Sequence, residues 1–249
     1  MPNHVQNVLH IGAETDARLH EIFEAIRGAA DEDGEPCFID FEKIIPMPSC
    51  LKIGDVTCID ESIPLSVTKE ELFEATLTRA FQYGWQKSWG LEDDAKEFMK
   101  KIAARVDRDY EARQVFAENV AKTGFKSWYD WSYTNWGTKW NAYEQEKSGS
   151  NCIRFWTAWA PPIPVIKALS EKFPDVDFEL EYVNEDISQQ VGSQTFRHGT
   201  VVEEVNYPYG HDCINLACDI WGYDDYDRAR YHCWYEGIDP DEHPEALEK

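Results

Sequence analysis

Apolar residues in the first part of the chain follow the periods of a strand, a helix and a second strand. Residues 5–12 contain a short apolar run that ends at Gly12. Behind the cap candidate Thr15, apolar residues then recur at helical spacing through residue 26. Residues 37–45 (CFIDFEKII), closed by Pro46 and Pro48, predict a second strand.

The middle of the chain has a helical pattern. Thr68 is followed three residues later by Glu71, which is the spacing of a capping box and predicts a helix start. Residues 91–122 predict a long amphipathic helix or helix pair with a charged, solvated face. An aromatic stretch, FKSWYDWSYTNWGTKWNAY, follows at residues 125–143.

The pattern of a strand, a helix and a strand returns after residue 150. Residues 151–159 predict a strand, and the prolines at 161, 162 and 164 open a helix, where their missing N–H costs nothing. Residues 176–183 (VDFELEYV) alternate strictly, which places Val176, Phe178, Leu180 and Tyr182 on the core face of a strand. A hairpin over residues 194–206 and helices over 211–221 and 224–234 complete the chain.

This order predicts an α+β fold with a ferredoxin-like antiparallel sheet, built from split βαβ halves with helices on one face. The expected domains are the sheet at residues 1–48 and 150–206, a helical Trp-rich insertion at 49–149, and an acidic helical tail at 207–249.

Charge narrows the classes of partner. The chain has 24 Lys and Arg against 47 Asp and Glu, a formal charge of −23. Such a field repels nucleic acid and anionic membranes, attracts basic surfaces, and exceeds what solubility needs. The chain shows no signal-peptide pattern and no run of about 18 apolar residues. Its seven cysteines lack CxxC spacing. We therefore expect a cytoplasmic protein with reduced thiols.

One strand concentrates this acidity. Asp175, Asp177, Glu179 and Glu181 are spaced two residues apart, so their carboxylates should repeat about every 6.7 Å along one face. No Lys or Arg lies between residues 172 and 197, so the segment has no counter-charge nearby in sequence, and Glu185 and Asp186 extend it. These residues are either an ordinary solvated strand face or a binding surface for a basic partner.

The aromatic stretch also has two interpretations. Trp136, Lys139 and Trp140 combine flat apolar rings with a cation, which suits an interface anchor. Gly137 between them permits a turn that other residues would resist. Alternatively, these rings pack the helical insertion onto the sheet, because large aromatic side chains are usually buried.

Metal binding and catalysis have weaker support. Cysteines and histidines gather in the tail, but their spacings do not match paired zinc ligands; the candidates are Cys213, Cys218, His232 and Cys233. The chain has no GxSxG, HExxH, GxGxxG or Walker lysine loop. We therefore predict no catalytic residues, no cofactor and no enzyme, and keep a metal site as an alternative.

Four segments are similar to a known family. PNHVQNVLHI, FEKIIPMP, NWGTKWNAY and FWTAWAPPIPVIKALSEKFPDVDFELEYVNED resemble the YubB-like family of phage and plasmid proteins, most closely over residues 125–186. The resemblance implies a ferredoxin-like domain and a mobile-element context, and it brings no activity that can be carried over residue by residue.

Together these features suggest an acidic mobile-element protein that inhibits a host nucleic-acid-binding defence protein. An anti-CRISPR or anti-restriction protein of this kind would bind the basic surface of its target in the bacterial cytoplasm, as a nucleic-acid mimic does. The alternatives are a metal-dependent factor or enzyme that uses the tail cysteines and histidines, and a scaffold that self-associates through tryptophan.

Overall fold

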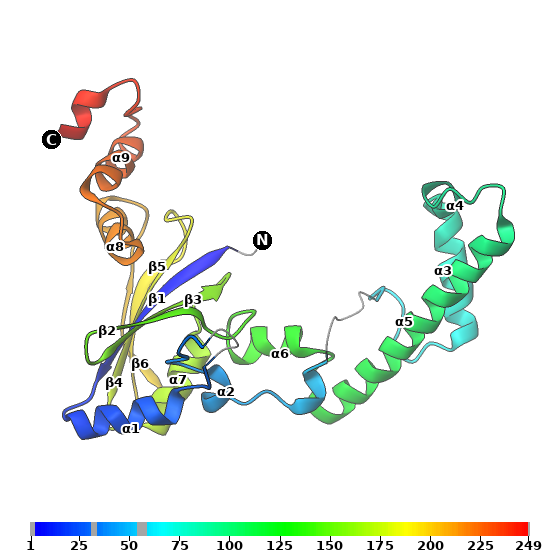
Figure 1. The fold of residues 1–249 in the computed structure, drawn as a ribbon, viewed down its shortest axis with the longest axis horizontal. Helices are drawn as coiled ribbons and strands as arrows, with labels where there is room; N and C mark the ends of the chain where they lie inside the picture. The colour runs from blue at the N-terminus through cyan, green and yellow to red at the C-terminus, as the bar shows by residue number, and fades with distance from the viewer. Residues whose placement is uncertain (1–2, 31–33, 54–58, 249) are drawn as a thin grey trace. The chain divides into compact units, whose positions relative to one another are not determined.

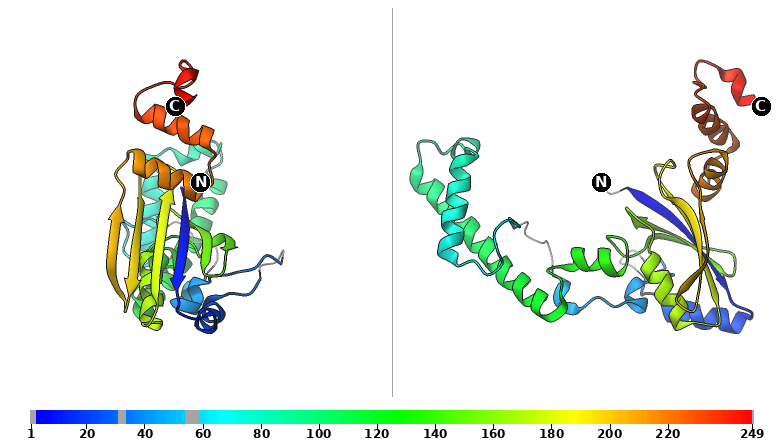
Figure 2. Two further views of the ribbon diagram at one scale, coloured as in Figure 1. Left: turned by 90° about the vertical axis from the view of Figure 1, so that its left-hand side faces the viewer. Right: turned by 180° about the vertical axis from the view of Figure 1, so that it is seen from behind.

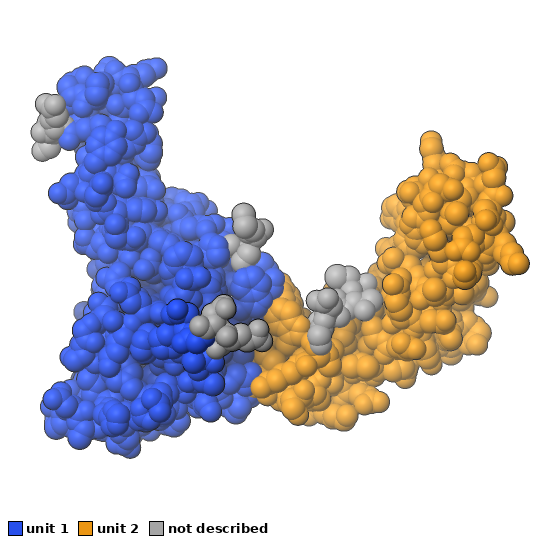
Figure 3. Space-filling view, viewed as in Figure 1, with its two compact units in different colours: residues 1–46, 132–249 blue, residues 47–131 orange. Residues whose placement is uncertain are grey.

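The structure, a computed structural model, describes residues 3–30, 34–53 and 59–248. The chain divides into two compact units (Figure 3). Unit 1 comprises residues Met1–Pro46 and Ser132–Lys249, and unit 2 comprises residues Met47–Trp131.

Unit 1 is built on an antiparallel sheet (Figure 1). Within the described residues its strands lie in the order β2-β3-β1-β4-β5-β6, and each neighbouring pair is antiparallel. The strands are β1 (His4–Gly12), β2 (Tyr143–Ser148), β3 (Cys152–Ala158), β4 (Asp177–Asn184), β5 (Val191–Arg197) and β6 (Thr200–Asn206). The predicted α+β class and the ferredoxin-like antiparallel sheet are confirmed.

One face of this sheet carries the main core. Phe178 and Leu180 of β4 are fully buried there, as the alternation predicts. Helix α7 (Ile163–Lys172) packs against β4 and β5, and Val165, Ile166 and Leu169 on it are fully buried. Helix α1 (Asp16–Ile26) begins where predicted, because the Thr15 side chain accepts a hydrogen bond from the backbone N–H of Arg18.

Helix α8 (His211–Trp221) lies against the opposite face, so helices lie on both faces of the sheet and not on one as expected (Figure 2). Its buried residues Ile214 and Ala217 pack in a cluster with Val8 and Val183. The reason is that α8 has an apolar stripe of its own, which must be covered. Helix α9 (Asp225–Tyr235) packs on α8, and the 3₁₀ turn η2 (Pro244–Glu248) packs on α9.

The predicted strand at residues 37–45 is wrong, because the segment instead contains the short helix α2 (Phe41–Ile44). Asp40 caps this helix by accepting from the N–H of Glu42 at 3.0 Å. The Asn141 side chain accepts from the N–H of Phe41 at 2.9 Å, and Gln145 accepts from that of Ile39 at 2.8 Å. Side chains thus satisfy donors that a strand would offer to a neighbouring strand.

Residues 143–148 also differ from expectation. The sequence pattern places them in the helical insertion, but they form β2 at one edge of the described sheet, with Glu146 opposite Arg154 of β3. Their sequence, YEQEKS, is almost entirely polar and has no apolar alternation that would identify a strand, and among the described strands β2 pairs with β3 alone.

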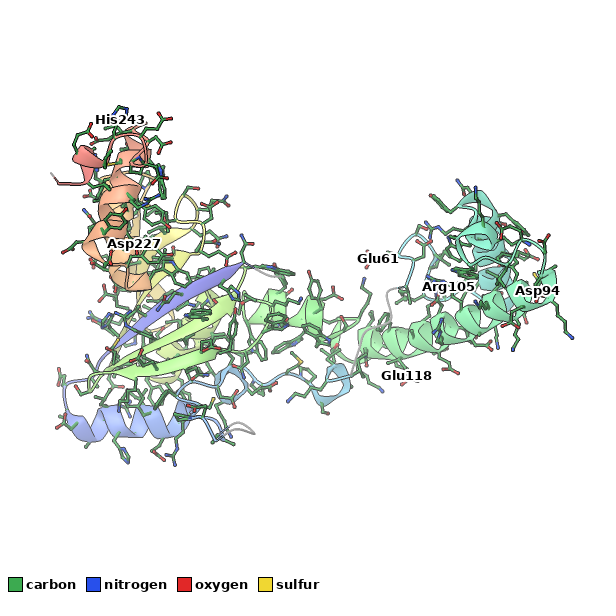
Figure 4. All side chains as sticks on the ribbon, turned by 45° about the horizontal axis from the view of Figure 1, so that its top comes forward. Glu61, Asp94, Arg105, Glu118, Asp227 and His243 are labelled. Atoms are coloured by element: carbon green, nitrogen blue, oxygen red, sulfur yellow. The ribbon has the colours of Figure 1, made fainter. Side chains whose placement is uncertain are left out.

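Unit 2 contains a pair of packed helices, α3 (Lys69–Gln82) and α5 (Ala95–Thr123). The predicted capping box is confirmed, because Thr68 and Glu71 exchange hydrogen bonds at the start of α3. Asp94 caps α5 and Glu118 lies near its end, where it pairs with Lys122 (Figure 4).

The remaining elements of unit 2 are short. They are η1 (Ser49–Leu51), α4 (Trp85–Ser88) and the first part of α6 (Trp128–Asn135). Arg113 is fully buried and donates to the carbonyl oxygens of Asp60, Ile63 and Pro64. Among the described residues, no helix is both long enough and apolar enough to cross a membrane.

Candidate acidic binding surface

The excess negative charge belongs to unit 1. Unit 2 has 12 of the 24 Lys and Arg and 15 of the 47 Asp and Glu, so its formal charge is −3. Unit 1 therefore carries the remaining −20. A basic partner would be attracted to unit 1, while unit 2 contributes little to the field.

Within unit 1, strand β4 presents acidic side chains on the face that α8 partly covers. Glu179 lies opposite His10 of β1 and Thr195 of β5, and Thr195 lies opposite Glu203 of β6. Directly opposed residues share a face, so Glu203 joins the acidic residues of β4. We call Asp177, Glu179, Glu181 and Glu203 the acidic face.

Part of the acidic strand is neutralised, which corrects the expectation that it lacks a counter-charge. Arg18 of α1 donates from Nε to Oδ2 of Asp175 at 2.9 Å, and Arg197 of β5 binds both carboxylate oxygens of Asp177. These guanidinium groups lower the pKa of Asp175 and of Asp177. Arg18 and Arg197 lie 157 and 20 residues away in the sequence from the aspartates that they pair with, so inspection of neighbouring positions misses them.

Glu181 lines a cavity of about 470 Å³ between the sheet and α8. Its Oε2 lies 3.3 Å from Nε2 of His10, and Cys152 lies opposite His10 on β3. Burial raises the pKa of the Cys152 thiol. A raised pKa disfavours the thiolate, which is the nucleophilic form of cysteine.

Glu179, Glu185 and Glu203 are exposed carboxylates of unit 1 that form no ion pair within the described part of the chain. The Asp186 carboxylate, by contrast, accepts hydrogen bonds from nearby side chains: from the Ser188 hydroxyl at 2.6 Å and from the Gln189 amide at 2.9 Å. These contacts lower the pKa of Asp186 and tie it to the turn before β5. Glu179, Glu185 and Glu203 are therefore available to a partner.

Trp136 has a structural role. It is 4% exposed, its Nε1 donates to the carbonyl oxygen of Ile45 at 2.9 Å, and its ring meets Phe41 edge to face. Trp136 is thus inaccessible to a partner in the folded chain, which corrects its assignment to a binding surface. Lys139 lies over the rings of Trp140 and Trp159, with Nζ 4.6 and 4.7 Å from their centroids.

The acidic tail is held in place by ion pairs. Arg228 pairs with Asp219 at 2.6 Å, and Arg230 pairs with Asp241 at 2.8 Å. Asp227 lies in the first turn of α9, and His243 lies in the segment that follows this helix (Figure 4). These contacts fix α9 and the turn after it to the rest of the tail.

The tail cysteines and histidines do not assemble as a metal site. Cys213 donates to the carbonyl oxygen of Ile187 at 3.1 Å, and burial raises the pKa of both Cys213 and Cys218. His232 instead contacts His211, with 2.7 Å between their Nδ1 atoms. Throughout the described ranges, no three His, Cys, Asp or Glu side chains form a group that could hold a metal ion.

The fold and these contacts describe a sheet domain with an acidic face, and comparison with known proteins gives its class. Residues 135–232, fewer than half of the 249, match the family model described as a ferredoxin-like domain in Api92-like protein. The match begins before β2 and extends into α9, so it includes α8.

One solved structure is similar to this chain: the crystal structure of a protein api92 from Yersinia pseudotuberculosis. The identity is 12% and the TM-score 0.36, over 84% of this chain and 99% of that one. No curated protein matches this sequence significantly. The YubB-like family that the sequence motifs resemble is not the one that the family model names, so a mobile-element origin stays a proposal.

Proposed function

We propose that this chain is a binding protein whose unit 1 attaches to the basic surface of a nucleic-acid-binding protein. The observation that carries the proposal is the concentration of charge: −20 of the total −23 lies in unit 1. The exposed Glu179, Glu185 and Glu203 form no ion pair in the described part of the chain. A basic groove supplies the charges they lack.

The partner we propose is a host defence protein of the CRISPR or restriction type, in the bacterial cytoplasm. Such a protein must hold nucleic acid in a basic groove, and an acidic domain bound there would keep nucleic acid out. The resemblance of the sequence to phage and plasmid proteins supports this choice. The alternatives lack comparable support, because Trp136 is buried and Cys213, Cys218, His232 and Cys233 serve the packing and hydrogen bonding of the tail.

Matched charge reversals in the two units test this proposal. One variant carries Glu179→Lys, Glu185→Lys and Glu203→Lys in unit 1. The control carries Glu74→Lys, Glu92→Lys and Asp93→Lys in unit 2, all at exposed positions, with the same change in net charge. Binding to purified CRISPR and restriction effectors, free of nucleic acid, is measured by surface plasmon resonance at several salt concentrations.

For an effector that binds the wild type, we expect the unit 1 variant to lose roughly tenfold or more in affinity and the control to lose much less. Wild-type affinity should fall as salt rises, because screening shortens the reach of exposed charges to about 8 Å at physiological ionic strength. Equal losses in the two variants, salt-independent binding, or no binding to any effector of either type would contradict the proposal.

A further inference from the structure

A second cavity in unit 1, of about 780 Å³, lies beside the edge strand β2. Its aromatic wall consists of three half-buried rings from three elements: Tyr143 of β2, Trp156 of β3 and Trp221 of α8. The Trp156 ring meets Tyr143 at 76° and Trp221 at 69°, with centroids 6.3 and 5.5 Å away. Rings set at steep angles around one space can enclose a small cationic group.

Carboxylates outnumber cations around this cavity. Among the described residues of the lining, the exposed Glu144 and Glu146 face one cation, Arg154. Arg154 lies opposite Glu146, and its Nη1 donates to the carbonyl oxygen of Ile220 at 3.0 Å. The charge of the lining therefore favours a cation over an anion.

The backbone of β2 is irregular at this point. The β2–β3 register shifts between Tyr143 and Glu146, and Glu144 has a φ of 47°, in the left-handed region. A bulge re-aims the side chains of its strand, and such backbone conformations concentrate at functional sites. The irregularity places Glu144 at the cavity next to Tyr143.

Two polar side chains of the lining, Tyr143 and Gln145, have hydrogen-bond partners. The Tyr143 hydroxyl donates to the carbonyl oxygen of Thr157 at 3.2 Å and lies 2.8 Å from Nδ1 of His4. Gln145 exchanges hydrogen bonds with the backbone of Ile39 on both its amide oxygen and its amide nitrogen. A ligand would meet ring faces and carboxylate oxygens, which are acceptors and suit a donor with positive charge.

We propose that this cavity binds the guanidinium group of an arginine side chain presented by the basic partner. The inference rests on the proposed function, since it names the group on the partner that unit 1 would anchor. Arginine fits better than lysine, because a planar guanidinium stacks on an indole and pairs with a carboxylate through two hydrogen bonds.

A tri-arginine peptide tests the cavity without the partner. Tri-citrulline, which has the same shape without the charge, and tri-lysine serve as comparisons. The indole N–H signals of Trp156 and Trp221, assigned through Trp156→Phe and Trp221→Phe, are followed by NMR during titration. We expect the arginine peptide to move both signals, the lysine peptide to bind more weakly, and the citrulline peptide to leave both unchanged.

Two double variants separate the cavity from the general acidity of unit 1. Glu144→Gln with Glu146→Gln should weaken tri-arginine binding at least fivefold, whereas Glu179→Gln with Glu203→Gln, which removes the same charge elsewhere, should change it less than twofold. All four residues are exposed, so neither variant disturbs the core. Equal losses in the two variants, or equal binding of tri-citrulline, would overturn the proposal.

Arg154, the cation in the lining of this cavity, provides a further check. If a tri-glutamate peptide moves the same two signals and Arg154→Met abolishes the effect, the cavity takes an anion and the proposal is wrong. If no effector binds through Glu179, Glu185 and Glu203, the proposed function fails while the peptide result still stands. If the peptide does not bind but the effector does, only the arginine cavity is excluded.

Discussion

Replacing Gly137 with alanine should destabilise unit 1 through two separate costs. Gly137 has a φ of +77°, and a Cβ added there would lie 2.7 Å from Cδ and 3.3 Å from Cγ of Pro164, in the first turn of α7. A residue with a Cβ pays about 1–2 kcal/mol for the left-handed conformation. Crowding against the rigid proline ring adds about 1–3 kcal/mol, as in other overpacked sites.

Gly149, in the turn between β2 and β3, provides a matched control. Its φ is +74°, but a Cβ there would meet no atom of the described residues within 4 Å, so Gly149→Ala has only the conformational cost. We therefore expect Gly137→Ala to lower the free energy of unfolding of unit 1 by about 2–5 kcal/mol, and Gly149→Ala by about 1–2 kcal/mol.

Hydrogen exchange of the β1 amides measures this difference. Because β1 is an interior strand of the sheet, its exchange requires unit 1 to unfold and does not depend on the stability of unit 2. Thermal unfolding should agree, with a loss of about 2–4 °C per kcal/mol for a unit of this size. Equal losses in the two variants would refute the argument, since they would show that the approach of Pro164 has no energetic effect.

Two further predictions concern unit 2 and the tail. Thr68→Ala removes the capping box of α3 and should lower the stability of this helix by about 1 kcal/mol. The α3 amides should then exchange faster than in the wild type, while the β1 amides are unchanged. The same α3 protection in the variant and the wild type would contradict this prediction. Burial, with His211 and Arg228, lowers the pKa of His232. The folded state therefore binds fewer protons than the unfolded chain, so α9 should lose protection as pH falls from about 7 to about 5. The loss of protection should be smaller in His232→Gln. If the protection of the α9 amides did not change with pH, the prediction would be wrong.

Local signals in the sequence predicted most of the elements of the sheet domain. The alternation of residues 176–183 located β4, and Thr15 and Thr68 located the starts of α1 and α3, because caps and strand periods depend on residues only a few positions apart. Edge strand β2 was missed because neither of its faces carries the apolar alternation that a buried face requires.

The sequence by itself determined the fold class, the acidic composition and the starts of α1 and α3, all of which follow from composition or from nearby residues. Only the tertiary structure decided which charges remain uncompensated. Arg18 reaches Asp175 from α1, and Arg197 reaches Asp177 from the neighbouring strand, so two of the four carboxylates at positions 175, 177, 179 and 181 are neutralised. The tertiary structure also buried Trp136 and placed the Trp156 ring in the lining of a cavity. Both outcomes depend on which segments fold side by side, and pairings between distant segments leave no periodic signal in a single sequence.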